Sequence, residues 1–159
     1  MKYILGIDPG LSGALALYDP EKPHVAVMDM PTLTIETNGK KRKRVDLYQL
    51  AQFFDMWAGE ISQAIIEDPR SMPNDGAVQA FKFGHCCGVV QAMTAAHFIP
   101  MSLPSPRLWK QRMRLTADKD ASRLLASQTL PAFAGQWPLV KHDGRAEAVL
   151  LAVYGARFV

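Results

Sequence analysis

The feature that most constrains the fold is the opening segment, residues 3–13, in which a short apolar run ends at an acidic residue and a tight turn. Residues 3–7 are mostly apolar and too few for a helix, so they predict a buried β-strand. Asp8 ends this strand, and Pro9-Gly10 predicts a turn directly after it. A carboxylate at the mouth of a buried strand is costly to desolvate unless it meets a partner. Asp8 is therefore either a cap of the turn, bound by backbone N–H groups, or a metal ligand or general base.

Composition favours one globular domain that meets an anionic partner. The chain has 159 residues, and we expect a single domain over residues 1–159. The net charge is +3 and the isoelectric point is about 9.0, which indicates a partner such as nucleic acid. The two cysteines, Cys86 and Cys87, are adjacent and lack zinc-site spacing, so they predict apolar fillers in a reducing compartment. With no apolar stretch of membrane-spanning length, we expect a cytoplasmic protein, cellular or phage-encoded, and an organelle location stays open.

The N-terminal third predicts an antiparallel meander followed by a hairpin. Residues 14–18 and 24–30 read as a second and a third strand joined by short turns. Asn38-Gly39, between β-prone residues, is a strong hairpin signal over residues 32–44. The second arm of that hairpin carries five consecutive cations, Lys40, Lys41, Arg42, Lys43 and Arg44. Such a run is a solvated face, a nuclear-localisation signal or a contact for a phosphate backbone, and we favour the last.

The rest of the chain alternates helices and strands. Apolar residues at helical spacing predict an amphipathic helix over 46–57, capped near Asp46. Residues 64–66 predict a buried strand ending at Glu67, which repeats the opening pattern of an acid at a strand tip. Parallel strands bring such tips together at one edge of a sheet. Further helices are expected over 77–96, 121–130 and 142–156, with a strand near 98–103 and a basic, proline-punctuated segment between 104 and 114.

A second pair of acids lies at the start of the last predicted helix. Asp143 and Glu147 are four residues apart and share one helical face. Taken singly, Asp143 could be an N-cap and Glu147 a surface residue. With Asp8 and Glu67 they form a set of four carboxylates, and oxygen ligands select hard cations such as Mg²⁺ or Mn²⁺. Two such ions about 4 Å apart can clamp the attacking water and the leaving oxygen of a phosphodiester.

These motifs resemble the RuvC-type Holliday junction resolvases, and most of all the compact phage and organelle branch of that family. The resemblance rests on residues 4–10, on Ile65-Ile66-Glu67 and on the late Asp143/Glu147 helix, and it runs through nearly the whole chain. It implies an α/β, ribonuclease H-like fold with a mixed central sheet of about five strands, the first three antiparallel, flanked by helices. It also implies a homodimer that cleaves four-way DNA junctions with two Mg²⁺ or Mn²⁺ ions per active site.

The resemblance also implies roles for individual residues. Asp8 would bridge both metals, and Glu67, Asp143 and Glu147 would complete the shell. Lys82, in Phe81-Lys82-Phe83-Gly84, is similar to a lysine of the family's Lys-x-Gly segment, and Lys110 and Lys119 stand where similar proteins carry DNA-contacting or catalytic lysines.

Two positions depart from the family pattern, and the role of one histidine has two explanations. Many bacterial members place the last two acids three residues apart, rather than the four found here. Arg70 stands where a stacking aromatic often follows the second acid, and an arginine can also stack on bases. His142 is either structural or a residue that orients a catalytic water.

Three other functions compete with junction resolution. The turn Asp8-Pro9-Gly10 followed by Gly13 also resembles the phosphate-binding turn of sugar kinases and actin-like ATPases, but those need two such domains around a nucleotide. A non-catalytic DNA-binding module would keep the basic hairpin and would not need four converging acids. A related nuclease could act on an RNA/DNA hybrid or a flap instead.

A stripe of mostly small residues along the predicted helix 77–96 favours dimerisation. The stripe consists of Ala77, Phe81, Gly84, Gly88, Gln91 and Ala95. Each glycine inside a helix costs about 1 kcal/mol relative to alanine, so a close contact is expected there. That contact is either a second copy of the chain or the protein's own sheet.

Overall fold

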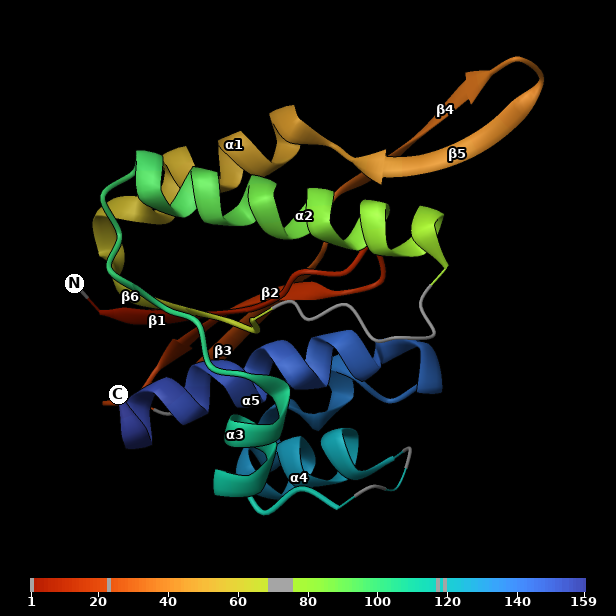
Figure 1. The fold of residues 1–159 in the computed structure, drawn as a ribbon. Coiled ribbons are helices and arrows are strands. Elements are labelled where there is room, and N and C mark those ends of the chain that lie inside the picture. Colours follow the sequence, from red (N-terminus) through yellow and green to blue (C-terminus); the bar gives the residue numbers. More distant parts are fainter. Residues whose placement is uncertain (1, 23, 69–75, 117, 119) are drawn as a thin grey trace.

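A five-stranded sheet in the order β3-β2-β1-β6-β7 forms the centre of the molecule in this computed structural model, which describes residues 2–22, 24–68, 76–116, 118 and 120–159 (Figure 1). The strands are β1 (Tyr3–Asp8), β2 (Ala14–Asp19), β3 (His24–Asp29), β6 (Ile61–Ile66) and β7 (Met101–Ser102). The first three are antiparallel neighbours, while β6 runs parallel to β1, and β7 parallel to β6. The predicted mixed sheet with an antiparallel start is confirmed.

Helices cover both faces of this sheet. α1 (Leu47–Trp57) and α2 (Ala77–Ala96) lie on one face, and α5 (Asp143–Phe158) lies on the other (Figure 1). α3 (Pro106–Arg112) and α4 (Ala121–Thr129) lie below α5, and short 3₁₀ turns η1 (Ala58–Glu60), η2 (Pro131–Gln136) and η3 (Val140–His142) join the elements. In the part of the chain that the structure describes, no helix combines the length and apolarity that crossing a membrane requires.

Alternation along the central strands builds two separate cores. In β1, Leu5 and Ile7 pack with the α1 and α2 side, whereas Ile4 packs with α5. Small residues occupy the α5 face of the first two strands: Gly6, Ala14 and Ala16. Their size lets the α5 backbone come close to the sheet, and α5 is accordingly buried over most of its length. This close packing fixes the first turn of α5 relative to the tip of β1.

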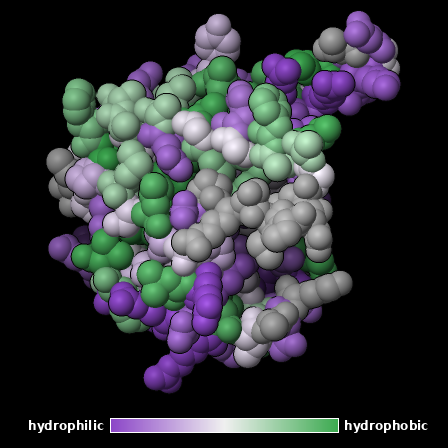
Figure 2. Space-filling view, viewed as in Figure 1, coloured by the Kyte–Doolittle hydropathy of each residue, from purple (hydrophilic) through white to green (hydrophobic). Residues whose placement is uncertain are grey.

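The predicted basic hairpin is present and projects from the body. β4 (Thr32–Thr37) and β5 (Lys40–Val45) pair with each other alone, and the turn residues Asn38 and Gly39 have φ values of 52° and 69°, as a two-residue hairpin turn requires. The hairpin extends at the upper right of Figure 1, and Figure 2 shows hydrophilic side chains gathered there. All five cations of β5 are exposed.

Two segments differ from the pattern expected after α2. The predicted strand 98–103 shrinks to Met101–Ser102, because Phe98 takes the left-handed conformation at φ 55° to end α2, and Pro100 has no N–H for a ladder. The prolines of segment 104–114 do not prevent a helix. Pro106 stands in the first turn of α3, where no N–H is needed, and the Ser105 hydroxyl accepts the Leu108 N–H at 3.3 Å.

Candidate active site

The parallel pairing of β1 and β6 brings the two predicted strand-tip acids together. The Glu67 N–H donates to the Ile7 carbonyl at 3.3 Å, so Glu67 follows β6 directly beside the end of β1. Asp8 is partly buried, and its Oδ1 accepts the Gly10 N–H at 3.3 Å. That single turn bond agrees with the capping role considered for Asp8.

The first turn of α5 lies directly over the Asp8 carboxylate because the helix has glycine there. A methyl group at Gly144 would stand 2.5 Å from the Ser12 carbonyl oxygen and 3.0 Å from Asp8 Oδ2. Only a residue without a side chain therefore permits this approach. The positive end of the α5 dipole consequently faces the strand tip, where it favours a carboxylate.

Three of the four predicted acids line one cavity. Asp8, Asp143 and Glu147 contribute to the walls of a hollow of about 470 Å³, together with Lys82 of α2 and Lys141. Glu67 lines an adjoining hollow of about 480 Å³ with Lys110. The chain thus places carboxylates from β1, from α5 and from the end of β6 at one edge of the sheet.

The charges of these acids act on one another. Burial, followed by the negative charge of Glu147 and then that of Glu67, raises the pKa of Asp8 from 3.8 to about 7. Burial also raises the pKa of Glu67, with Glu147 adding to the rise and the Trp109 hydrogen bond opposing it. Glu147, whose four-residue spacing departs from the bacterial pattern, is thus the acid of α5 whose charge reaches both strand-tip acids.

Each of the other three acids is held by a donor that the sequence patterns did not single out for it. Trp109 Nε1 donates to Glu67 Oε1 at 2.9 Å. Glu147 Oε1 accepts from Lys110 Nζ at 2.9 Å and from the Ser122 hydroxyl at 3.0 Å. Arg123 Nε donates to Asp143 Oδ1 at 2.7 Å, and the same guanidinium also meets Asp120.

Sequence reasoning missed Trp109, Ser122 and Arg123. Trp109 is 42 residues from Glu67, and Ser122 is 25 residues from Glu147. No local spacing links such partners, and among these donors only Lys110 stands at a position that the family resemblance marks. One signal was available for Trp109, which directly precedes Lys110. A buried indole needs an acceptor for its N–H, so a tryptophan at this position indicates a nearby acceptor such as a carboxylate.

Four carboxylates suit a hard divalent cation chemically, and burial, with the charge of Glu147 adding to it, raises the pKa of both Asp8 and Glu67, a cost that a cation would relieve. Among the described residues, however, no three His, Cys, Asp or Glu side chains form a group that could hold a metal ion. Trp109, Lys110, Ser122 and Arg123 donate to one oxygen each of Glu67, Glu147 and Asp143. Binding a metal would require these side chains to turn.

The predicted DNA-binding residues fall into three groups. Lys40, Lys41, Arg42, Lys43 and Arg44 are exposed on β5, and Lys43 lines a hollow next to the acids with Lys141 and Arg145. Lys82 lines the acid cavity itself, and Lys110 bonds to Glu147. Arg70 and Lys119 lie outside the described residues.

His142 occupies a structural position in the 3₁₀ turn before α5. Its Nδ1 accepts the Leu139 N–H at 3.3 Å. It contributes to the hollow that Lys43, Asp29 and Arg145 line, whereas the walls of the acid cavity are formed by its neighbours Lys141 and Asp143. Of the two roles considered for His142, this geometry favours the structural one.

Comparison with known proteins identifies the fold. No protein-family model and no curated protein sequence matches the chain. Solved structures do match, and the chain has a RuvC-type fold of the ribonuclease H-like class. One match is Thermus thermophilus RuvC in complex with a Holliday junction substrate, with a TM-score of 0.58 and 16% identity over 98% of this chain and 93% of that one. A second Thermus thermophilus RuvC structure matches with a TM-score of 0.53 and 16% identity, over 98% and 95% of the two chains.

Proposed function

We propose that this protein is an endodeoxyribonuclease that resolves four-way DNA junctions by metal-dependent hydrolysis of phosphodiester bonds. The observation that carries the proposal is the convergence of Asp8, Glu67 and Glu147 at one sheet edge, in a RuvC-type fold, where burial and the charge of Glu147 raise the pKa of both Asp8 and Glu67. Structural acids are not usually gathered where they repel one another, whereas catalytic acids often are.

The acids would hold two Mg²⁺ or Mn²⁺ ions. When bound, such ions activate water and stabilise the charge that develops on a phosphodiester. Asp8, which the first turn of α5 covers, would supply carboxylate oxygens to these ions. Glu67, Glu147 and Asp143 would supply the remaining oxygens after Lys110 and Arg123 release them. The two cations could then bind the DNA backbone, because the metal would have taken the carboxylate partner of each.

Positive surface next to the acids supports a DNA substrate. Lys82 and Lys141 line the acid cavity, and Lys43 and Arg145 line the hollow beside it. The hairpin extends this positive surface away from the body (Figure 2). Cations arranged in this way contact phosphates without reading sequence.

A substrate panel tests the proposal. The purified protein is incubated with a mobile four-way junction, a flap, an RNA/DNA hybrid and a linear duplex of matched sequence, each with Mg²⁺ and with EDTA. We expect nicks in the junction alone, in Mg²⁺ alone, at paired positions in opposing strands. Preferred cleavage of the hybrid or the flap would assign a different substrate to the same site. Binding without cleavage of any substrate would identify a DNA-binding module instead.

A further inference from the structure

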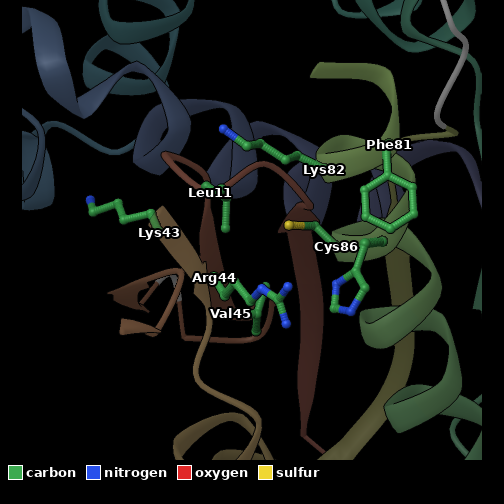
Figure 3. Close-up of a pocket in the computed structure, with 8 residues that line it drawn as sticks. Leu11, Lys43, Arg44, Val45, Phe81, Lys82 and Cys86 are labelled. Atoms are coloured by element: carbon green, nitrogen blue, oxygen red, sulfur yellow. The ribbon is translucent and has the colours of Figure 1, made fainter. Parts of the chain in front are cut away.

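A small pocket outside the acid cavity lies between the base of the hairpin and α2 (Figure 3). It has a volume of about 100 Å³, room for one small ring system. Its lining comes from three segments: the loop after β1, the end of β5 and the first half of α2. The lining residues are Leu11, Lys43, Arg44, Val45, Phe81, Lys82, His85 and Cys86.

The walls are apolar and the rim is positive. Leu11, Val45 and Cys86 supply aliphatic and thiol surface, and Phe81 supplies an aromatic ring that is 72% exposed. Figure 3 shows the Lys82 side chain extending across the pocket to end above Leu11, whereas the ammonium end of Lys43 points away from the other lining residues. Among the described residues that line it, none is a carboxylate. An occupant that suits this lining combines a flat, weakly polar ring with negative charge next to it.

The pocket adjoins the acid cavity. Leu11 and Lys82 line both, and Lys43 lines both the pocket and the hollow beside the acids. A strand whose phosphate reaches the acids would therefore pass close to the pocket mouth. An exposed aromatic ring at that position offers a stacking face to an unpaired base.

We propose that this pocket holds one unstacked nucleobase of the DNA strand that enters the acid cavity. The base would stack on the Phe81 ring. The His85 ring, whose centroid lies 6.5 Å from that of Phe81, would face the edge of the base. Lys43, Arg44 and Lys82 would bind the flanking phosphates. The proposal rests on the proposed function, because it requires bound DNA with an unpaired base near the cleavage site. It adds a reason for choosing branched over linear DNA: a continuous duplex offers no free base.

The test combines base removal in the DNA with side-chain removal in the protein. A four-way junction carries a single abasic nucleotide, moved one position at a time through the crossover, and its affinity is measured without divalent cations for the wild type, Phe81→Ala and His85→Ala. Stacking of one base on an aromatic ring is worth enough that we expect about 10-fold weaker binding of the wild type at one position. In Phe81→Ala the same abasic position should change affinity less than 2-fold, because the stacking partner is already gone.

Controls separate the pocket from other effects of the substitutions. Val78→Ala truncates another exposed apolar residue of α2 that does not line the pocket, so it should retain the full abasic penalty. Because Phe81 is also part of the small-residue stripe, light scattering must give the same mass for Phe81→Ala as for the wild type. His85 lies off that stripe. In His85→Ala, the abasic nucleotide at the same position should reduce affinity by less than it does in the wild type.

The outcomes distinguish this proposal from the proposed function. Coupling between one abasic position and Phe81 supports the pocket, even if the protein cleaves nothing. If the abasic nucleotide reduced the affinity of Phe81→Ala as much as that of the wild type at every position, in a protein that does cleave junctions, the pocket proposal would be overturned and the nuclease proposal would stand. Failure to bind junctions at all would overturn both.

Discussion

At the scale of single residues, Asp8 carries the largest electrostatic cost in the proposed site. Its carboxylate is partly buried within reach of the charges of Glu147 and Glu67, and among the described residues one backbone N–H, that of Gly10, donates to it. The folded protein therefore binds the proton of Asp8 more tightly than the unfolded chain does. Burial first, and then the charges of Glu147 and Glu67, make the ionised form of Asp8 unfavourable at a place where a cation would stabilise it.

The cost of keeping Asp8 ionised predicts a pH-dependent gain in stability for Asp8→Asn. The pKa of Asp8 rises from 3.8 to about 7 on folding, so between these values the folded state binds more protons and wild-type stability falls as pH increases. Asparagine cannot ionise. We therefore expect Asp8→Asn to raise the free energy of unfolding by on the order of 2 kcal/mol at pH 8 and by almost nothing at pH 4.

Urea unfolding in EDTA at both pH values measures this difference. Glu21→Gln removes an exposed carboxylate from the turn after β2 and serves as the control, with no such pH-dependent gain. Equal stability of the wild type and Asp8→Asn at pH 8 would show that the acids do not repel one another as described.

The candidate site was predictable from the sequence only where its residues end regular elements. Asp8 and Glu67 follow apolar strands, and Asp143 and Glu147 share a helical face, so local patterns sufficed to select them. The donors that hold the acids come from α3 and α4, and nothing local couples Trp109 to Glu67 or Arg123 to Asp143. Those hydrogen bonds arise from the packing of α3 and α4 against α5, which periodicity does not specify.

At the scale of elements, the position of α5 over the strand tip depends on Gly144. A methyl group there would overlap the Ser12 carbonyl and press on the Asp8 carboxylate. We expect Gly144→Ala to lower the free energy of unfolding by about 1–3 kcal/mol, although alanine is the better helix former by about 1 kcal/mol. Gly135→Ala is the matched control, because a methyl group at Gly135 meets nothing within 4 Å. A stability gain for Gly144→Ala, measured by thermal or urea unfolding, would contradict the close approach.

The basic hairpin should act by binding phosphates. Replacing Lys40, Lys41, Arg42, Lys43 and Arg44 with alanine should weaken binding to junction and duplex alike, because binding to the DNA backbone carries no sequence information. The slope of log affinity against log salt concentration should flatten by roughly 0.9 for each phosphate that the variant no longer neutralises. Arg157→Ala, near the end of α5 that is remote from the hairpin, should leave the slope unchanged (Figure 1). An unchanged slope for the hairpin variant would mean that its cations are merely solvated.

The elements themselves were largely predictable because their signals are local. The Asn38-Gly39 turn, the Asp46 cap and the apolar strands each act within a few residues, and Asp46 does accept the Tyr48 and Gln49 N–H groups at 3.1 Å. The predicted strand at 98–103 was wrong in extent, because the termination of α2 and Pro100 outweighed β-propensity there. The positions of β6 and β7 in the sheet depend on tertiary packing, so no local sequence signal predicts them.

At the scale of the whole molecule, the outward face of α2 remains without a partner among the described residues of the chain. Gly84 and Gly88 are exposed, and a methyl group at either would meet nothing within 4 Å, so the stripe does not pack on the protein's own sheet. Figure 2 shows hydrophobic colours over α1 and α2. Contact with a second copy stays a prediction for the stripe.

We therefore predict a homodimer through α2. Light scattering of the DNA-free wild type at micromolar concentration should give about twice 17.6 kDa, and Gly88→Leu should give the monomer. Because the added side chain meets open space within one chain, the variant should fold normally, as checked by circular dichroism and unfolding. It should also fail to make paired cuts, since a two-fold dimer presents two sites to a two-fold junction. A wild-type mass near 17.6 kDa would count against this interface.

The most direct measurement of the central claim is junction cleavage by Asp8→Asn beside the wild type, at equal binding. Both proteins are saturated with a labelled four-way junction, Mg²⁺ is added, and the rate of strand nicking is followed at neutral pH. We predict that Asp8→Asn binds the junction within a few-fold of the wild type and nicks it at least ~100-fold more slowly, because one metal ligand is removed without a change of shape. Nicking by Asp8→Asn within a few-fold of the wild-type rate would contradict the assignment of this sheet edge as a nuclease site.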